Sequence, residues 1–201
     1  TRALVVFYDT CCLKSAMPLT TYLANSFERE HEADMFAQLA ESLSEKTEKL
    51  SDPYILIGNL SVGGEDLDAL LIKRNGLSVV ELKAHGGLVV FDENMPWQVG
   101  RSQVRGGGRA NPFLQVKAYR HAVHHFLKAK AGQILSRQRE IVWRNVAAKI
   151  IFGRPISFDD SVLGLNLRLW FSISDLDHSA DEFLTLKSSG FDLLAEEVER
   201  I

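Results

Sequence analysis

The sequence predicts an α/β fold in which helices flank a central mixed β-sheet, with core elements in the order α-β-β-β-α-β. Three observations support this prediction. Residues 27–46 carry apolar side chains at helical spacing, and two apolar runs flank Asn75-Gly76 as in a β-hairpin. Asn111-Pro112 opens a second helix over residues 111–130. Helices packed against such a sheet give an α/β sandwich.

The other elements follow from the same periodicities. Strands are expected at residues 54–60, 67–74, 77–84, 88–91, 147–152 and 168–172, and further helices at 132–143 and 193–201. In the first helix, Glu32 precedes Met35 and Phe36 by three and four residues, so its side chain is expected on the face toward the sheet. An equally weighted alternative is that this acid only complements the helix dipole.

The hairpin places charged groups at one end of apolar strands. A type I′ turn at Asn75-Gly76 pairs Leu70 with Glu81 and Asp68 with Lys83, which puts the three charged side chains on one face. Asp68 then lies diagonal to Glu81, about 7–8 Å away along the backbone. Charges in such an apolar strand need a ligand or partners, so we predict a metal site. The alternative is a solvent-exposed face with an ordinary Glu/Lys pair, and a one-residue slip would separate the two acids.

Asp68, followed by Glu81-Leu82-Lys83, resembles the D…(D/E)xK pattern of the PD-(D/E)xK nuclease superfamily, although Leu67 stands where the proline would be. The order of motifs along the chain more specifically resembles the nuclease-related domain (NERD) family. These motifs are Glu32, Asp68, Glu81-Leu82-Lys83, Gly86-Gly87, Trp97 and Asn111-Pro112-Phe113-Leu114-Gln115. The resemblance extends from about Phe27 to Asp175 and implies a restriction-endonuclease-like sandwich.

By this resemblance, the chain is expected to be a Mg²⁺- or Mn²⁺-dependent nuclease that hydrolyses phosphodiester bonds of DNA, with RNA the less favoured substrate. The implied metal ligands are Glu32, Asp68, Glu81 and the Leu82 carbonyl, and the implied catalytic residues are Asp68, Glu81, Lys83 and Gln115. Oxygen ligands select a hard cation, and Lys83 would orient the attacking water or stabilise developing charge. The competing interpretation is a catalytically inactive module that binds nucleic acid or a partner and is attached to a larger helicase or kinase protein. Retention of the acids and Lys83 favours the enzyme.

The second helix carries two further patterns. Gln115 and Tyr119 share a helical face, as in the Q-x-x-x-Y element of some exonucleases of the superfamily, which implies that Gln115 lies near the substrate phosphate. For Tyr119, a core position is favoured. His121, His124 and His125 have chelating spacing, but no cysteine or acid joins them in that helix. A surface or packing role is therefore favoured over a zinc site.

Basic residues are concentrated in one part of the chain, although the net charge is only −3. Residues 101–154 contain twelve Lys or Arg and one acid, so this segment carries +11 and the rest −14. Beside an acidic metal pocket, such a segment favours phosphate binding over scattered surface charge. The expected nucleic-acid contacts are Arg101, Arg105, Arg109, Lys117 and Arg120. The three glycines within residues 101–109 suggest a mobile loop that contacts the substrate strand, and no Gly-Lys-Ser/Thr follows them to make a P-loop.

Composition limits what can be expected for the number of domains, membrane spans and disulfide bonds. With 201 residues, 46% of them hydrophobic and 24% charged, the chain is expected to form one domain over residues 27–201, as a fragment of a longer protein, after an N-terminal extension at 1–26. The apolar run 4–8 is expected to be an extra strand or a disordered lead. No apolar run approaches the roughly 18 residues of a membrane span, and adjacent Cys11 and Cys12 give no disulfide framework. These features favour a cytoplasmic location.

Overall fold

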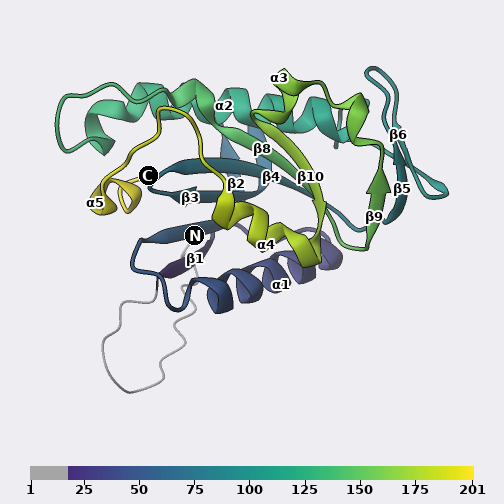
Figure 1. Ribbon diagram of the computed structural model, residues 1–201, viewed down its shortest axis with the longest axis horizontal. Coiled ribbons are helices and arrows are strands. Elements are labelled where there is room, and N and C mark those ends of the chain that lie inside the picture. The colour runs from purple at the N-terminus through teal and green to yellow at the C-terminus, as the bar shows by residue number, and fades with distance from the viewer. Residues whose placement is uncertain (1–17) are drawn as a thin grey trace.

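The computed structural model describes residues 18–201, and its centre is a six-stranded mixed sheet. The strand order is β1-β2-β3-β4-β8-β10, with β2, β3 and β4 antiparallel and the other neighbours parallel. Helices α1 (Glu30–Thr47) and α4 (Leu176–Thr185) cover one face, and α2 (Pro112–Ile134) covers the other (Figure 1). This arrangement confirms the predicted αβββαβ core and is consistent with a restriction-endonuclease-like sandwich. The sheet strands are β1 (Leu19–Leu23), β2 (Tyr54–Val62), β3 (Glu65–Lys73), β4 (Gly76–Lys83), β8 (Ala147–Phe152) and β10 (Phe171–Asp175).

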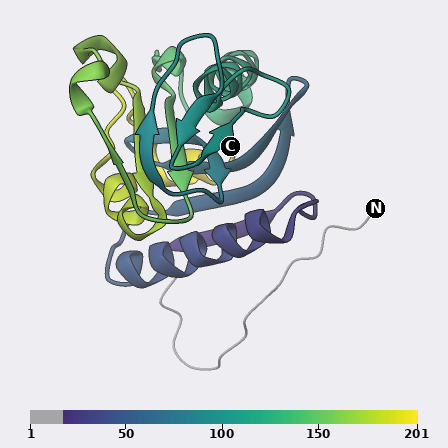
Figure 2. The same ribbon diagram turned by 90° about the vertical axis from the view of Figure 1, so that its right-hand side faces the viewer.

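A second, four-stranded sheet lies at one end of the sandwich and faces the viewer in Figure 2. Its order is β7-β6-β5-β9, and the sequence predicts only the strand at residues 88–91 among them. Its strands are β5 (Gly87–Val90), β6 (Trp97–Val99), β7 (Ser102–Val104) and β9 (Ile156–Phe158). Short helical turns complete the fold: η1 (Trp143–Asn145), η2 (Asp160–Val162), α3 (Leu165–Arg168) and α5 (Ala195–Val198).

The large sheet is buried on both faces, which explains the nearly continuous apolar runs of β3 and β4. Leu71 and Leu82 pack toward α1, whereas Ile72 and Val79 pack toward α2. Helix α1 approaches the sheet closely because β2 has a glycine at position 58. A Cβ there would lie 2.7 Å from the Phe36 ring, so any other residue would push the helix away.

The β3–β4 hairpin has a different turn from the predicted one. Lys73 pairs with Gly76, so Arg74 and Asn75 form the turn, and neither Asn75 nor Gly76 has the positive φ of a type I′ turn. The predicted turn type was therefore wrong. A distant segment contributes to the observed turn, because the N–H of Ser188 donates to the Asn75 carbonyl at 2.9 Å.

This turn shifts the strand register by two residues, so that Leu70 pairs with Val79 rather than with Glu81. Because the shift is even, the side chains from Ala69 to Leu82 keep their predicted faces, whereas Leu67 packs in the same cluster as Leu70 and Ile72. The hydrogen-bonded pairs end at Ala69 and Val80, so Asp68 and Glu81 each follow directly after the last pair of the ladder. Glu81 alternates with Leu82 and shares the face of Val79, which α2 covers.

Two other predicted elements differ in the structure. The helix expected over residues 132–143 is wrong, since α2 ends at Ile134 and the next helical turn begins only at Trp143. That segment instead bonds to α5, with the N–H of Ser136 donating to Oε1 of Glu197 at 2.8 Å. The strand expected at 168–172 begins later, at Phe171, because Arg168 ends the short helix α3.

The N-terminal predictions lie outside the described residues, namely the apolar run 4–8 and the cysteine pair Cys11 and Cys12. Within residues 18–201, no helix is both long and apolar enough to cross a bilayer.

Candidate active site

The predicted acids meet where β3 and β4 lie beside each other. Glu81 belongs to a central strand that pairs with both β3 and β8, and only 3% of the residue is exposed. Asp68 is half-buried on β3, beyond the last hydrogen-bonded pair, Ala69 with Val80. The N–H of Leu82 donates to Oδ2 of Asp68 at 2.7 Å, which holds this carboxylate against β4.

The two carboxylates repel each other in this setting. Burial raises the pKa of Asp68 well above its usual range, and the neighbouring charge of Glu81 raises it further. The hydrogen bond from Leu82 and the charge of Lys83 oppose that shift without cancelling it. Two neighbouring carboxylates in such a largely buried place form a favourable site for a cation.

One oxygen of Glu81 is available to such a cation. Lys83 Nζ contacts Oε1 of Glu81 at 2.5 Å, and both side chains are mostly buried. The other oxygen, Oε2, is buried and has no hydrogen-bond partner among the described residues. An unsatisfied buried carboxylate oxygen is costly, and a hard metal ion is a suitable partner for it. The site therefore fits the Mg²⁺ or Mn²⁺ that the sequence suggests.

Glu32 approaches the same acids from the first turn of α1. It lies one helical turn before Phe36, whose ring packs on β2 at Gly58, and its charge contributes to the raised pKa of Asp68. Its side chain is 15% exposed and contacts Arg29 at 3.2 Å. The structure thus brings Glu32 near the acids, and it also gives Glu32 the helix-terminal place of the alternative interpretation.

Helix α2 adds two polar groups on the opposite side of the acids. Tyr119 is buried, as predicted, and its pKa is raised first by burial and then by the charges of Glu81 and Asp68. Gln115, one turn earlier, is buried and accepts a hydrogen bond from Arg109 at 3.0 Å.

These elements are shared with a known family. The family model of the nuclease-related domain matches residues 28–152, which run from just before α1 to the end of β8. The chain belongs to the nuclease-related domain family. No curated protein and no solved structure matches it significantly.

The remaining NERD motif residues support the site instead of entering it. Asn111 caps α2 by accepting from the Leu114 N–H at 3.0 Å, and its Nδ2 donates to the carbonyls of Asp92, Glu93 and Met95 at 3.0–3.2 Å. This one side chain therefore fixes both the start of α2 and the loop before Trp97. The loop also accepts a bond from the Trp97 indole, which donates to the Asp92 carbonyl at 3.0 Å.

The glycine pair of the NERD pattern, Gly86 and Gly87, follows β4 where the chain passes close to Arg154 and Pro155. A Cβ on Gly86 would lie 2.4 Å from the Cβ of Arg154, and Gly87 has a φ of +103°. The N–H of Gly87 donates to the Pro155 carbonyl at 2.8 Å. Side chains at these positions would separate the two segments directly after Lys83.

The glycine segment, for which a mobile loop is expected, contains a short strand and a tight turn. Residues 102–104 form β7, and Gly106 bridges to Arg109 across a tight turn. A Cβ on Gly106 would lie 2.3 Å from the Asn111 carbonyl oxygen, so only glycine lets this turn pack on α2. The packing presents Arg109 to Gln115, and the guanidinium also contacts Glu65 at 2.6 Å. Sequence reasoning missed this link, because nothing in the local pattern pairs residue 109 with residue 65.

The five predicted nucleic-acid contacts differ in whether their side chains already bind other groups of the fold. Arg101, Arg105 and Lys117 are exposed. Arg109 contacts Glu65 and Gln115. Arg120 donates to the carbonyls of Val146 and Arg144 and lies over the Trp170 ring, so its guanidinium is largely committed to the fold.

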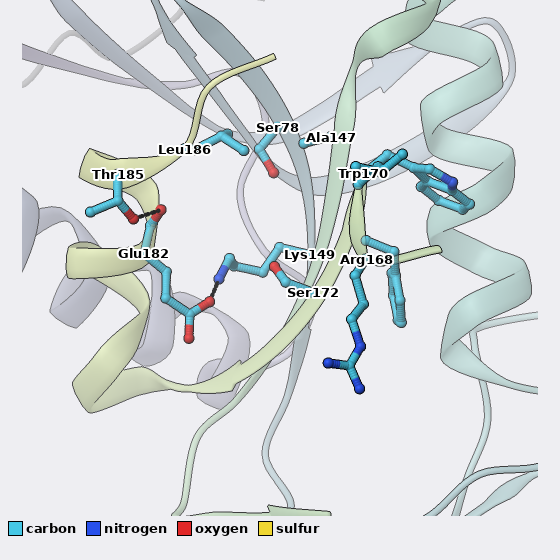
Figure 3. A pocket seen from close by; sticks show the side chains of 11 residues that line it. Ser78, Ala147, Lys149, Arg168, Trp170, Ser172, Glu182, Thr185 and Leu186 are labelled. Carbon is cyan, nitrogen blue, oxygen red and sulfur yellow. Dashed lines mark hydrogen bonds and ion pairs between the residues drawn. The ribbon is translucent and has the colours of Figure 1, made fainter. Parts of the chain in front are cut away.

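Another basic residue of the segment, Lys149, is buried at a pocket of ≈ 210 Å³ (Figure 3). It forms an ion pair with Glu182 of α4 there. Burial lowers the pKa of Lys149, and the charge of Glu182 opposes this shift. None of the predicted catalytic residues lines this pocket, so we assign the pair a structural role.

His85 is a residue near the site that sequence reasoning did not identify. It follows Lys83 by two positions, and its ring Nδ1 is buried without a hydrogen-bond partner among residues 18–201. Burial lowers its pKa, as do the charges of Lys83, His31 and Arg154. A Lys-Ala-His sequence carries no recognisable motif, so only the fold could reveal this proximity.

Proposed function

We propose that this nuclease-related domain is a metal-dependent nuclease that hydrolyses phosphodiester bonds of DNA. The observation that supports the proposal most directly is the pair of neighbouring carboxylates, Asp68 and Glu81, in which a buried Glu81 oxygen has no hydrogen-bond partner within residues 18–201. Asp68, Glu81 and the Leu82 carbonyl would hold Mg²⁺ or Mn²⁺, with Glu32 as an additional ligand. A bound divalent cation supplies an activated water and neutralises charge on the phosphate.

The side chains around the acids have complementary roles in this proposal. Lys83 lies at the same end of β4 and can donate a hydrogen bond to the attacking water or to a phosphate oxygen. Gln115 carries an amide that Arg109 holds in one orientation, so it can position the phosphate group. Tyr119, whose pKa is raised by burial and by the two acids, keeps its hydroxyl hydrogen and can donate it to a neighbouring oxygen without adding charge.

DNA binding is proposed on the distribution of charge. Arg101, Arg105 and Lys117 are exposed within the basic segment, and cations in such positions bind phosphates in a sequence-independent way. Arg109 and Arg120 are proposed as secondary DNA contacts, because the guanidinium of each already binds groups within the fold. RNA and an associated helicase or kinase domain stay as alternatives for the experiments to test.

The decisive experiment incubates the protein with labelled linear duplex, circular and single-stranded DNA in Mg²⁺, Mn²⁺ or EDTA. Cleavage is expected with either metal and not with EDTA. Asp68→Ala, Glu81→Ala and Lys83→Ala should each lower turnover by about 10²-fold or more, the usual loss when one charged group that stabilises a transition state is removed. Because the three groups act together, a double variant should be little worse than a single one.

His178→Ala is a matched surface control, since His178 pairs only with Asp175 at the start of α4. Its cleavage rate should equal that of the parent. If Lys83→Ala retains nearly the turnover of the parent, the role assigned to Lys83 is wrong. If the parent binds DNA but cleaves none of the substrates with any metal, the chain is an inactive binding module.

A further inference from the structure

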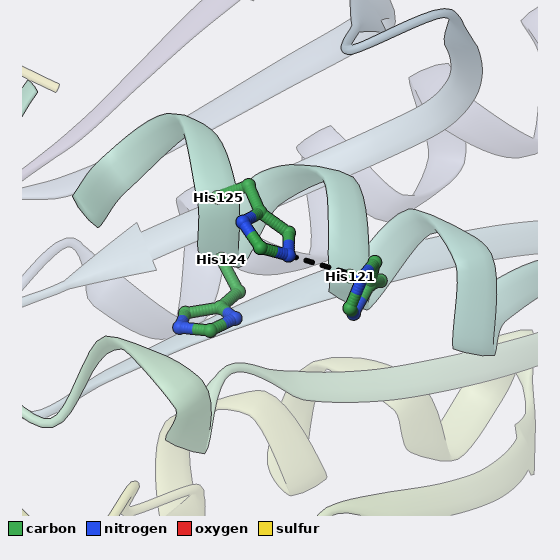
Figure 4. A group of neighbouring side chains, drawn as sticks. All are labelled: His121, His124 and His125. Atoms are coloured by element: carbon green, nitrogen blue, oxygen red, sulfur yellow. Dashed lines mark hydrogen bonds between the residues drawn. The ribbon is translucent and has the colours of Figure 1, made fainter. Parts of the chain in front are cut away.

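A second group of possible metal ligands lies on α2, away from the acids. His121, His124 and His125 project from one side of the helix (Figure 4). One nitrogen from each ring lies within 4.8 Å of the others. The helix buries Val116, Tyr119, Val123 and Leu127 on its other side, so this cluster faces away from the sheet.

The spacing of two of these nitrogens is that of ligands on a single ion. Nε2 of His125 lies 3.0 Å from Nε2 of His121. Two nitrogens that each lie about 2.0–2.1 Å from a tetrahedral or octahedral metal ion are separated by about 3 Å. The structure also orients these two nitrogens toward each other, as the dashed line in Figure 4 shows.

The cluster borders open space. His121 and His125 line a hollow of ≈ 500 Å³ together with Gly63 at the β2–β3 turn, Glu65 and Arg109. An ion at the cluster would therefore have room for additional ligands. Glu65 of β3, which is distant in sequence, lines the same hollow, where its carboxylate pairs with Arg109 at 2.6 Å.

We propose that His121, His124 and His125 form a binding site for a borderline transition-metal cation, with Zn²⁺ as the principal candidate. Imidazole ligands suit Zn²⁺, Ni²⁺ and Cu²⁺ and do not suit Mg²⁺, so the site is chemically distinct from the carboxylate site. Three neutral ligands leave the ion its full charge and at least one coordination position open to water or an anionic oxygen. This inference is independent of nuclease activity.

The test measures Zn²⁺ binding calorimetrically in a protein carrying Cys11→Ser and Cys12→Ser, with excess Mg²⁺ present to occupy the acidic site. One equivalent should bind. His121→Ala and His125→Ala should each weaken binding at least tenfold, and His124→Ala should weaken it measurably. His178→Ala, which removes another exposed histidine, is the matched control and should leave the affinity unchanged.

Two further readouts keep the result independent of folding defects. Zn²⁺ should raise the melting temperature of the parent but not of the His121→Gln/His125→Gln double variant, because a ligand that binds only the folded state stabilises it. Circular dichroism should show both proteins to be equally helical. Unchanged Zn²⁺ affinity in the double variant would overturn the proposal. Absence of Zn²⁺ binding to the parent would also overturn it and leave a hydrogen bond between His121 and His125.

Discussion

The N–H of Leu82 donates to Oδ2 of Asp68 at 2.7 Å, so the strand that carries Glu81 also holds the acid from its neighbour. The same bond partly offsets the repulsion between the two carboxylates. This arrangement holds two negatively charged groups close together inside the fold, and their repulsion is unfavourable for the metal-free protein. A cation would relieve it, and several measurable consequences follow from that relationship.

Replacing Asp68 by Asn should stabilise the protein when no divalent cation is present. The amide oxygen can still accept from Leu82, while the repulsion with Glu81 disappears. A gain of about 1 kcal/mol would raise the melting temperature by about 2–4 °C for a domain of this size. The measurement is thermal unfolding in EDTA, followed by circular dichroism.

Adding Mg²⁺ should raise the melting temperature of the parent and have little effect on Asp68→Asn. Gly108→Ala serves as a control, because a Cβ at Gly108 meets no atom within 4 Å. A variant that melts well below the parent in EDTA would show that the two acids do not oppose each other.

Arg109 and Gln115 should behave as one unit in cleavage. Arg109 donates to Oε1 of Gln115 at 3.0 Å, so loss of the arginine frees the amide that it orients. Gln115→Ala and Arg109→Ala are each expected to lower kcat by about tenfold, and the double variant should lose little more. Steady-state kinetics on a labelled duplex measures all four proteins.

Arg109→Lys separates orientation from charge in this pair. It keeps the positive charge but loses the planar fork that contacts Gln115 and Glu65 together. If Arg109 acts through Gln115, this variant should have reduced kcat with nearly unchanged KM. Strictly additive losses in the double variant would indicate that the two residues act separately.

The exposed cations of the basic segment should control how DNA affinity depends on salt. Arg101→Glu, Arg105→Glu and Lys117→Glu together should flatten the plot of log affinity against log salt. Each phosphate contact contributes a slope of about −0.9 on duplex or about −0.7 on single strands. Fluorescence anisotropy across a salt series measures this slope. Arg109 is left in place because its reversal would set two acids against each other at Glu65.

A charge reversal elsewhere supplies the control for this measurement. Lys49 and Lys187 are exposed and lie outside the basic segment, one after α1 and one after α4. Their replacement by Glu changes net charge but should leave the slope almost as in the parent. Equal slopes in the parent and the triple variant would show that DNA does not contact Arg101, Arg105 and Lys117.

Acid should destabilise the C-terminal part of the domain through Glu197. Burial raises the pKa of this carboxyl, but hydrogen bonds from the Leu194 and Ser136 N–H groups, with the charges of Arg139 and Arg200, lower it overall. A lowered folded-state pKa contributes stability above the unfolded value of about 4.3, and this stability is lost as the pH falls through the folded value.

The comparison with Glu197→Gln tests this pH dependence. The free energy of unfolding of the parent should exceed that of the variant near neutral pH, and the difference should shrink as the pH drops below about 4.3. Urea unfolding at a series of pH values measures both proteins. A difference that stays constant down to the lowest pH would mean that the charge of Glu197 contributes nothing.

The sequence alone determined on which faces most residues of β3 and β4 lie and which elements form the αβββαβ core. Period-two alternation placed Asp68 and Glu81 together even though the predicted turn was wrong, because the actual register differs by an even number of residues. Helical periodicity likewise placed Tyr119 in the core, and the Asn-Pro pair marked the start of α2. Such local patterns are reliable because backbone geometry fixes them.

Only the tertiary structure decided the features that depend on contacts between distant segments. The turn at Arg74 and Asn75 is held by residues more than a hundred positions later, and no local propensity encodes those bonds. The link from Glu65 through Arg109 to Gln115, the burial of His85 and the second sheet arise in the same way. Packing and hydrogen bonding between remote segments outweigh local preference there, because buried polar groups must find partners wherever the fold places them.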